Sequence, residues 1–503
     1  MDKIILNGHN LSFEDLYQIA YNNKQIEIDE AALDKAAKAR KVLFDKAAEG
    51  YPVYGLNRGV GWNKDKEFDV DFFETYNRNL LYCHSLGIEP LSTEEEVRAM
   101  MLVRLNTALC GSTGISVEIL KMLRDFLNKG IHPVVPRRGS IGEGDITILS
   151  HIGLAIIGEG EVNYKGKRIN SKEALSKEGM KPAILGPKDG LSIVSSNAQT
   201  AAGSVFLVKE VEEIIKISNV VYCLGMEGLN GVIQPLDERV NDMRGLKGQI
   251  KCADECRKYL EESYLYEPNK DRALQDALSF RCSFAINGSV LDALEYVKKY
   301  LLIQINTTDD NPCIMTDINN LSVSANFEIT SLVAGIEMLG IVLCHLSKSS
   351  CNRMLKLADP SFTKLTRFLT PDEQKTIAYG TIQKTFTAID AENRMLANPS
   401  SIDFYSISGN IEDHATNGPL VVDKVRKIVD NLKYIIGMEA IHAAQAVDLR
   451  NNVKMGKGTK AAYDAIRGVI PYLDKDRNLS VDIKAAYDII NSGELLRKVE
   501  NAK

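Results

Sequence analysis

The sequence predicts a mainly α protein built around a bundle of long helices. In the segments 204–225, 288–303 and 419–450, valine, leucine and isoleucine recur at three- and four-residue steps, which is the spacing of one helix face. The segment 329–349 is apolar nearly all round, as a central buried helix is. Helices of roughly 20–30 residues with few strands between them are typical of helical bundles.

The N-terminal region predicts shorter elements. A short strand is expected at residues 4–6. Ser12 is a plausible start of the first helix, because acidic residues follow it in the first turn. The alanine-rich segment 31–49 predicts a second helix, which Gly50 ends.

The next elements are a long helical segment and a hairpin. Residues 91–129 read as helical, and Thr93, followed by three glutamates, is a plausible capped start. Residues 161–169 alternate around Lys165-Gly166, which predicts a small β-hairpin. We expect an N-terminal region at 1–200 and a helical region at 201–503, sharing one core with a soft boundary.

Composition excludes several classes of protein. The 503 residues are 45% hydrophobic and 25% charged, which is ordinary for a globular protein, and the net charge is −6. Dispersed basic residues argue against nucleic acid as a partner. The nine scattered cysteines fit reduced thiols. No basic-then-apolar leader is visible, and no apolar run is expected to reach the roughly 18 residues that span a bilayer. We therefore expect a soluble cytoplasmic protein without a membrane partner.

A glycine-rich stretch within 134–162 is the most distinctive part of the chain. Gly139, Gly142 and Gly144 follow a Pro-Arg-Arg entry, and a mostly apolar segment comes next. Asp145 is well placed to cap the following helix, whose first N–H groups attract negative charge. The glycines are spaced G-x-x-G-x-G, which is not the dinucleotide-binding pattern G-x-G-x-x-G.

Seven motifs occur in an order that is specific. They are YGLNRGVG (54–61), RLNTALCGSTG (104–114), GSIGEGD (139–145), LQDALSFRC (274–282), INTTDDNP (305–312), NPSSIDFYSISGNIEDH (398–414) and AAQAVDLR (443–450). Together they resemble the histidine/phenylalanine/tyrosine ammonia-lyase superfamily from about Tyr54 to Asp476. The resemblance implies a mainly α fold with a long central bundle of the fumarase/aspartase type. It also implies N-terminal active-site loops, a small-molecule substrate, and a homotetramer whose sites combine loops of three subunits.

One departure from the family pattern concerns its prosthetic group. Family members form the electrophile 4-methylideneimidazol-5-one (MIO) from an Ala-Ser-Gly tripeptide, in which the glycine nitrogen attacks the alanine carbonyl and serine loses water. Here Glu143 replaces the Ala-Ser pair before Gly144, and no hydroxyl or thiol precedes that glycine. We therefore expect no MIO, and no other cofactor or metal. Because Glu143 lies near a helix start, we expect it to tend to stay ionised, which favours a base or a cation contact over an acid.

Further departures accompany this one. The segment 189–199 is one residue longer than its family counterpart, so Ser195 falls at the position of a family asparagine and Asn197 is displaced. In addition, Glu328 stands where the family has histidine, and Leu278 where the histidine-type pattern has tyrosine. We interpret the shorter loop and the longer segment as compensating changes in one remodelled pocket.

Other positions match the family's functional residues. The resemblance makes Tyr54 the base that removes a β-proton, although a phenol needs nearby positive charge to act as one at neutral pH. It makes Arg281 the clamp for a substrate carboxylate. Glu412 resembles the histidine-specific branch, and Glu143 with Glu412 is an expected acid/base partner. The remaining expected substrate contacts are Cys83, His84, Asn197, Gln275, Asn306 and Phe327.

Three functional interpretations follow. The first is a lyase that works without MIO, by β-elimination of an amine or oxygen leaving group from a small carboxylate or acyl substrate. The second is a non-catalytic homologue that binds a small carboxylate or a partner protein. The third is an ordinary histidine or aromatic amino acid ammonia-lyase. We favour the first, because Tyr54 and Arg281 persist beside coordinated loop changes.

Overall fold

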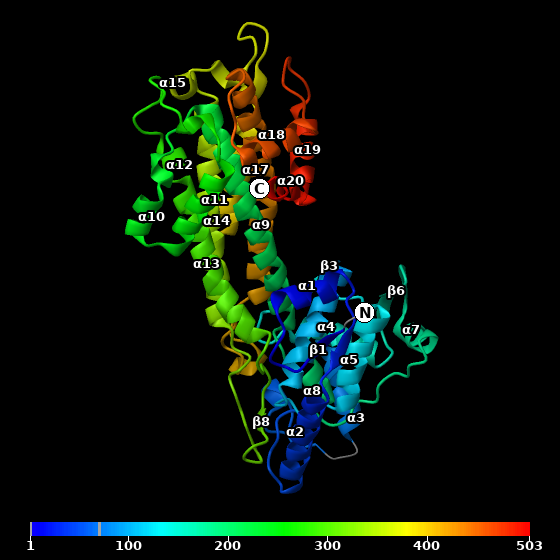
Figure 1. Cartoon of the computed structure of the whole chain (residues 1–503). Coiled ribbons are helices and arrows are strands. Elements are labelled where there is room, and N and C mark those ends of the chain that lie inside the picture. Colours follow the sequence, from blue (N-terminus) through cyan, green and yellow to red (C-terminus); the bar gives the residue numbers. More distant parts are fainter. Residues whose placement is uncertain (1–2, 69–71, 503) are drawn as a thin grey trace. The chain divides into compact units, whose positions relative to one another are not determined.

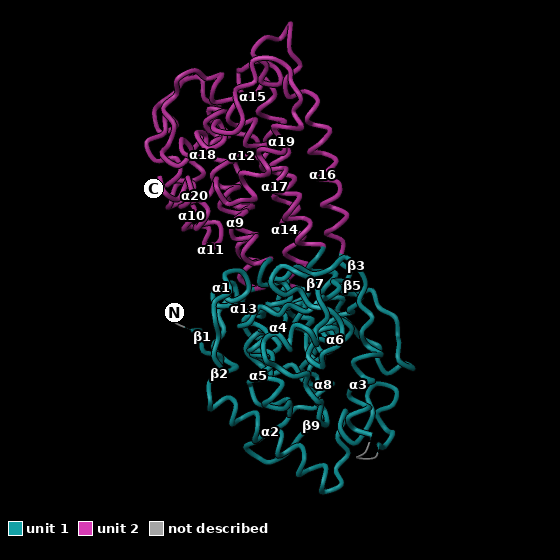
Figure 2. Tube along the Cα trace, turned by 90° about the vertical axis from the view of Figure 1, so that its right-hand side faces the viewer, with its two compact units in different colours: residues 1–206, 298–334, 399–423 teal, residues 207–297, 335–398, 424–503 magenta. Residues whose placement is uncertain are grey.

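The computed structural model describes residues 3–68 and 72–502, and most of them are helical (Figure 1). The chain forms two compact units, each assembled from three stretches of sequence (Figure 2). Unit 1 comprises residues 1–206, 298–334 and 399–423, and unit 2 comprises 207–297, 335–398 and 424–503. The first unit therefore takes in two segments beyond residue 200, which the sequence alone places with the helical region.

Unit 1 is organised around helix α4 (Glu94–Leu109), which is buried on nearly all sides. Thr93 begins it with a capping box, in which the Thr93 hydroxyl and the Glu96 carboxylate each accept a backbone N–H of the other residue. Helices α1 (Phe13–Tyr21) and α5 (Val117–Lys129) pack against α4. The unit also contains α2 (Glu30–Ala48), α3 (Phe73–His84), α6 (Ile146–Ile156), α7 (Ser171–Lys177), α8 (Asp189–Val194) and the 3-10 turns η1 (Gly61–Asn63) and η7 (Ser408–Asn410).

The described part of unit 1 contains four small sheets. Strands β1 (Ile4–Leu6) and β2 (Ile26–Ile28) pair in parallel, and the other pairs are antiparallel. These are β3 (Ile88–Leu91) with β5 (Pro136–Arg138), β4 (Ile131–Pro133) with β6 (Glu161–Tyr164) and β7 (Lys167–Asn170), and β8 (Cys313–Met315) with β9 (Asn320–Ser322). Lys165 and Gly166 both have positive φ in the β6–β7 turn, as a two-residue hairpin requires. The predicted hairpin is therefore present, with β4 as an additional strand.

Four buried charges connect α4 to the segments behind the glycine-rich loop. The Arg104 guanidinium lies 3.2 Å from an Asp309 oxygen and 3.4 Å from an Asp310 oxygen, and the Lys188 ammonium lies 3.2 Å from Asp310. All four side chains are almost fully buried. Burial lowers the pKa of Lys188 and raises that of Asp309, and the opposite charges of Asp310 and Arg104 counter these two shifts. Two cations and two anions thus compensate one another inside unit 1.

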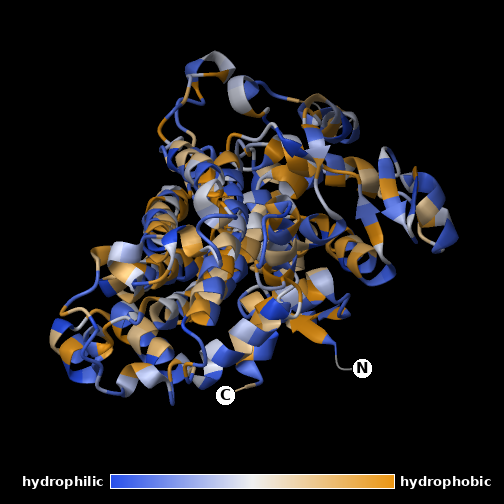
Figure 3. Cartoon of the chain, turned by 90° about the horizontal axis from the view of Figure 1, so that it is seen from above, coloured by the Kyte–Doolittle hydropathy of each residue, from blue (hydrophilic) through white to orange (hydrophobic). Residues whose placement is uncertain are grey.

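Unit 2 consists of helices. Four long ones, α9 (Ala198–Leu229), α13 (Ser283–Gln304), α14 (Thr330–Leu357) and α17 (Gly418–Leu449), contribute residues to both units. Apolar and polar residues are interleaved along the helices (Figure 3). A buried ion pair joins α14 to α17, because two guanidinium nitrogens of Arg353 lie 2.5 and 2.7 Å from the two Glu439 oxygens. The shorter helices are α10 (Glu238–Arg244), α11 (Lys247–Tyr259), α12 (Leu278–Arg281), α15 (Pro360–Thr363), α16 (Gln383–Leu396), α18 (Lys457–Arg467), α19 (Leu479–Asn491), α20 (Glu494–Glu500), η3 (Gln234–Leu236), η4 (Tyr264–Tyr266), η5 (Arg367–Leu369) and η6 (Ala378–Gly380).

The mainly α fold and its four long helices are confirmed. One difference concerns 91–129, which forms two helices, α4 and α5. Gly111 and Gly114 between them both have positive φ, and a side chain added at Gly111 would overlap Lys35.

A second point concerns the length of the apolar helices. Within the described residues, Asp189–Leu229 and Thr330–Leu357 are long and apolar enough to span a membrane by length and composition alone, a test that a buried core helix also passes. The most apolar window of the first is 94% buried inside the structure and that of the second 56%, so packing within the chain covers most of the first.

The buried charges predict a large effect from removing Arg104. Arg104→Met leaves Asp309 and Asp310 with only Lys188 as a counter-charge, and an uncompensated buried charge costs about 3–5 kcal/mol. We expect a marked fall in the urea concentration at which far-ultraviolet circular dichroism is half lost. Lys41→Ala is the control, because Lys41 forms an exposed i,i+4 pair with Asp45; a surface pair of this kind contributes roughly 0.3–0.5 kcal/mol. Equal midpoints for the two variants would contradict a structural role for the buried charges.

Candidate active site

A cavity with two adjoining lobes lies in unit 1. The lobes measure about 360 and 390 Å³, a size that suits small molecules. Both are lined by Tyr54, His84, Ile146, Leu191, Ser408 and Glu412. We call the first the aromatic lobe, because Trp62 and Tyr76 also line it, and the second the loop lobe, because Glu143 and Gly144 of the glycine-rich loop also line it.

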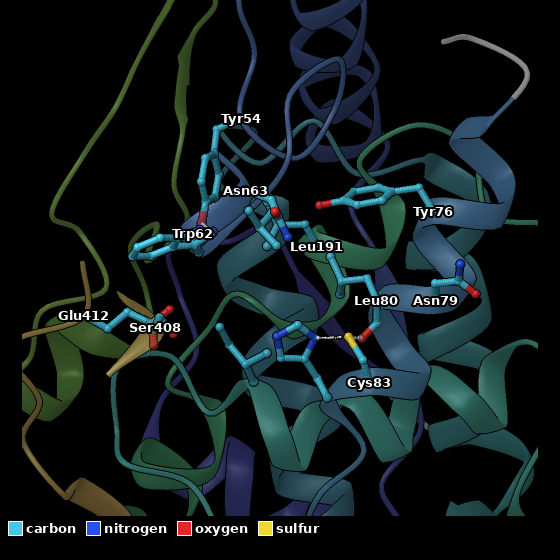
Figure 4. Close-up of a pocket in the computed structure, with 14 residues that line it drawn as sticks. Tyr54, Trp62, Asn63, Tyr76, Asn79, Leu80, Cys83, Leu191, Ser408 and Glu412 are labelled. Atoms are coloured by element: carbon cyan, nitrogen blue, oxygen red, sulfur yellow. Dashed lines mark hydrogen bonds between the residues drawn. The ribbon is translucent and has the colours of Figure 1, made fainter. Parts of the chain in front are cut away.

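Two chain segments meet on one side of the aromatic lobe. Figure 4 shows Tyr54 and Trp62 on the same side as Glu412, with Tyr76 on the other. Trp62 belongs to η1, and Glu412 follows η7. A side chain at Gly409 would overlap the Trp62 ring, so glycine at this position permits the close approach of the two segments.

Tyr54 is held by the backbone of its own loop. Its hydroxyl oxygen accepts a hydrogen bond of 2.8 Å from the Gly61 N–H. Burial raises the pKa of Tyr54, the Gly61 contact lowers it, and the negative charge of Glu412 raises it again, for a net rise. None of the described causes of this pKa shift is the nearby positive charge that a tyrosine base needs. The phenol is therefore neutral near pH 7.

Cys83 and His84 end α3 beside the cavity. His84 Nδ1 lies 2.8 Å from the Leu80 carbonyl oxygen and 3.2 Å from Cys83 Sγ. His84 lines both lobes, whereas Cys83 lines the aromatic lobe. Burial raises the pKa of the Cys83 thiol, so it is neutral near pH 7. The expected pair therefore faces the cavity with an imidazole and a neutral thiol.

The glycine-rich loop forms a wall of the loop lobe. Gly139, Gly142 and Gly144 all have positive φ, and a side chain at Gly142 would overlap the backbone of Gly418. The Gly144 N–H donates to Asn197 Oδ1 at 3.1 Å. This backbone places the intervening Glu143 side chain on the lobe.

Glu143 is partly buried and incompletely satisfied. Its Oε2 atom is buried and has no hydrogen-bond partner among the described residues. Burial raises its pKa to about 7, with the charge of His414 acting against this and those of Glu328 and Glu412 adding to it. With a pKa of about 7, Glu143 is partly protonated near neutral pH and mostly ionised at pH 8. Desolvation and two neighbouring carboxylates therefore weaken the ionised state that the helix start favours, without abolishing it.

Asp145 begins α6 but does not cap it with its side chain. The buried carboxylate accepts from the Thr200 N–H at 2.9 Å and from the Ser140 hydroxyl at 2.7 Å. Burial raises the pKa of Asp145 to about 6, and these hydrogen bonds act in the opposite direction. Asp145, which we expected to cap the helix, thus links the glycine-rich loop to the start of α9 by hydrogen bonds.

Asn197 and Asn306 are placed away from the cavity wall. Asn197 is fully buried, and its amide nitrogen donates to the Phe327 carbonyl at 2.5 Å. Asn306 bonds the backbone of Leu11 through both ends of its amide. Neither asparagine is among the described residues that line the cavity. The family resemblance predicts that both contact the substrate, whereas in the structure both bond the protein backbone. Phe327 does line the loop lobe, as expected.

Gln275 and Arg281 belong to unit 2. There the Arg281 guanidinium donates to the Gln275 side-chain oxygen. Arg281 is the last residue of α12, and Gln275 lies in the exposed segment before it. The structure therefore pairs these two expected carboxylate-binding residues with each other.

The chain matches one family over almost its whole length. Residues 11–468 match the family described as aromatic amino acid lyase. The chain belongs to that family. Histidine ammonia-lyase from Alkaliphilus oremlandii is 34% identical, with 100% of this chain and 99% of the relative covered.

Two solved structures of this lyase family share its fold. The ergothioneine-degrading enzyme ergothionase from Treponema denticola, in complex with desmethyl-ergothioneine sulfonic acid, is 61% identical with a TM-score of 0.97, covering 98% of this chain and 100% of its own. Histidine ammonia-lyase from Trypanosoma cruzi is 26% identical with a TM-score of 0.90, covering 100% of this chain and 96% of its own.

The residues of the glycine-rich loop do not fit the family's MIO group. Forming it requires the glycine nitrogen to attack a carbonyl and a hydroxyl-bearing neighbour to lose water. The Gly144 nitrogen instead donates to Asn197, and the preceding Glu143 carries a carboxylate with an unpartnered oxygen among the described residues. No step of the chemistry below therefore involves that group.

Several lining residues escaped sequence comparison. Asn311 lines the loop lobe and lies in the INTTDDNP motif, where we singled out Asn306 instead. Trp62 directly follows the YGLNRGVG motif and is the single tryptophan of the chain, which was an available signal. Ser408 lies within the motif at 398–414, where we singled out Glu412 instead. Tyr76 carried no distinguishing signal, because it reaches the cavity only through the folding of its helix.

The raised pKa of Glu143 predicts a pH-dependent penalty to stability. The folded pKa of about 7 exceeds the ordinary value of 4.5, so stability falls as pH rises from 4.5 to 7 and the loss is complete above 7. Glu143→Gln removes the penalty. Because the side chain is partly exposed, we expect a gain of about 1 kcal/mol at pH 8 and little at pH 5.

Thermal melts at the two pH values measure this difference. Asp317→Asn, in the exposed β8–β9 turn, is the control and should change neither melt. A Glu143→Gln variant that is less stable than the wild type at pH 8 would show that the carboxylate has a stabilising partner.

Proposed function

We propose that this protein is a lyase that eliminates trimethylamine from ergothioneine without an MIO group. The whole-length likeness to the Treponema denticola ergothionase carries this proposal, and Glu143 in place of the electrophile-forming residues supports it. Ergothioneine is the trimethylbetaine of histidine with sulfur on its imidazole ring. The predicted site residues suit a histidine-like ring and a carboxylate. The acidic loop lobe suits a fixed positive charge.

The leaving group explains how the electrophile becomes dispensable. A primary ammonium group loses a proton to a base more readily than the neighbouring carbon does. A quaternary ammonium has no N–H proton to lose, so it stays a cationic leaving group at every pH. The base removes the Cβ proton, those electrons form the Cα–Cβ double bond, and the Cα–N electron pair departs with neutral trimethylamine. The products are a sulfur-bearing imidazole acrylate, trimethylamine and one proton.

Tyr54 is the proposed base. Burial and Glu412 raise its pKa, whereas a substrate with a fixed positive charge in the adjoining lobe lowers it. The substrate therefore supplies the positive charge that the tyrosine requires. The Gly61 N–H bonds the phenol oxygen and further stabilises the phenolate.

The remaining substrate groups have proposed partners. The imidazole ring fits the aromatic lobe, where His84 and Cys83 are available. Arg281 is the proposed partner of the carboxylate, because a guanidinium matches its two oxygens. We further propose that a neighbouring subunit of a homotetramer delivers Arg281 and Gln275, as the family resemblance implies.

Ordinary histidine deamination is the alternative that the curated relatives favour, since they are histidine ammonia-lyases. It requires the electrophile, and Glu143-Gly144 lacks the residue that forms it. Non-catalytic binding is the remaining alternative.

The decisive experiment offers ergothioneine and histidine to the purified protein. We expect trimethylamine in the proton NMR spectrum and a rise in near-ultraviolet absorbance from the conjugated product. For ammonia release from histidine we expect a kcat/KM at least about 100-fold lower than that for ergothioneine. Each tenfold rate difference corresponds to only about 1.4 kcal/mol of barrier.

The other outcomes each select a different function. Ammonia from histidine, together with protein absorbance that borohydride abolishes, identifies an ordinary MIO enzyme. Binding of ergothioneine without turnover identifies the non-catalytic homologue.

Replacing Tyr54 tests the proposed base. Tyr54→Phe should lower kcat by about 10²- to 10⁴-fold, the usual contribution of a general base, with KM changed by less than about threefold. Tyr76→Phe is the matched control, since Tyr76 lines the same lobe on the side away from Tyr54 and Glu412 (Figure 4). Similar losses in the two variants would argue against a specific proton transfer by Tyr54.

A further inference from the structure

We propose that Glu143 is the counter-ion that binds the quaternary ammonium group of the substrate, and that it is not an acid or base in the reaction. This inference rests on the proposed function and deepens it, because it assigns one end of the substrate to one lobe of the cavity. It also selects the cation contact over the acid/base role, both of which the sequence left open for this residue.

The first support is the position of the carboxylate. Glu143 lines the loop lobe, and its buried Oε2 atom has no hydrogen-bond partner among the described residues. A buried unpartnered oxygen is unfavourable unless a ligand compensates it. A cation in the loop lobe would do so. Phe327 lines the same lobe, and aromatic rings attract quaternary ammonium groups.

The second support concerns the two neighbouring carboxylates, because Glu328 has other contacts and Glu412 is shared between the two lobes. Glu328 accepts from the Thr330 N–H at 2.7 Å, and His414 Nε2 lies 3.4 Å from it. Glu412 borders both lobes, and its charge acts on Tyr54 as well as on Glu143. The charged or titratable groups that act on Glu143 are therefore His414, Glu328 and Glu412. Glu143 is the one among these three carboxylates that extends from the glycine-rich loop into the loop lobe.

The third support is the chemistry of the leaving group. Trimethylamine departs as a neutral molecule, so it needs no proton from a general acid. Tyr54 takes the carbon-bound proton, so a second base is not needed either. The single remaining task for a carboxylate here is to balance the positive charge of the bound substrate.

A counter-ion has a distinctive kinetic effect. The positive charge on nitrogen disappears as the carbon–nitrogen bond breaks, so a nearby carboxylate stabilises the bound substrate more than the transition state. Its removal should raise KM without lowering kcat in proportion. Removal of a catalytic acid or base lowers kcat instead. The two roles therefore give different results in one measurement.

The closing experiment measures ergothioneine kinetics at pH 8 in wild-type, Glu143→Gln and Glu143→Asp proteins. We expect Glu143→Gln to raise KM roughly tenfold or more, with kcat reduced by less than about threefold. Glu143→Asp keeps the charge and should recover part of the affinity. Glu328→Gln is the matched control, since it removes a nearby charge that does not line the lobe, and its effect on KM should be clearly smaller. A large fall in kcat with KM unchanged would overturn the proposal, as would equal effects of Glu143→Gln and Glu328→Gln.

A binding measurement separates this inference from the proposed function. Tetramethylammonium chloride should bind the wild-type protein in calorimetry, roughly tenfold more weakly in Glu143→Gln, and more tightly at pH 8 than at pH 6 in the wild type only. The sign follows because a pKa near 7 leaves Glu143 mostly protonated at pH 6 and ionised at pH 8. If ergothioneine is not turned over, the proposed function fails while this measurement still tests Glu143. Identical tetramethylammonium binding by wild type and variant would overturn the inference even in an active enzyme.

Discussion

The wall of the cavity is supported by four buried charged residues, which are Arg104, Lys188, Asp309 and Asp310. Besides the Arg104 contact, Asp309 accepts from the Ser196 hydroxyl at 2.7 Å and from the Asn197 N–H at 3.1 Å. Asn197 in turn accepts from the Gly144 N–H and donates to the Phe327 carbonyl. One chain of contacts therefore runs from α4 to both sides of the loop lobe. Such support fixes a reactive geometry only if its own members are immobile, which buried ion pairs with several hydrogen bonds ensure.

This arrangement accounts for how the loop accommodates a different residue at position 143. Asp145 and Asn197 hold the backbone on either side of Glu143, through Thr200, Ser140 and the Gly144 N–H. These contacts involve backbone atoms and buried side chains, so they do not depend on the side chain at position 143. A shorter loop with a different residue can therefore keep the same wall. The longer segment before α9 supplies Ser195 to the lobe and leaves Asn197 behind it.

Sequence reasoning predicted the fold and part of the site for identifiable reasons. The long helices and the capping box at Thr93 are local patterns, so periodicity and spacing suffice to find them. Tyr54, His84, Glu143, Phe327 and Glu412 came from the family resemblance, and the structure places all five on one cavity.

Sequence reasoning was less successful where a position depends on tertiary contacts. Asn306 and Asn197 carry the expected side chains, but their amides bond the protein backbone. The pKa of Glu143 depends on burial and on Glu328 and Glu412, which are distant in sequence, so the helix start alone does not predict that this carboxyl titrates near neutral pH. The ammonia-lyase motifs also identify the family more sharply than the reaction, because Glu143, on which the proposed reaction depends, departs from them.

The unsatisfied carboxylate at Glu143 connects stability to function in this family member. A partly buried acid with a raised pKa and an unpartnered oxygen destabilises the folded protein, and nothing in the packing of the loop requires it. Such a residue is retained most simply when a ligand compensates its charge. In MIO enzymes this position creates an electrophile that acts on a poor leaving group. A substrate with a permanently cationic leaving group removes the need for that electrophile and creates a need for negative charge at the same place. On the proposed function, the carboxylate that replaces the electrophile-forming residues follows the chemistry of the substrate.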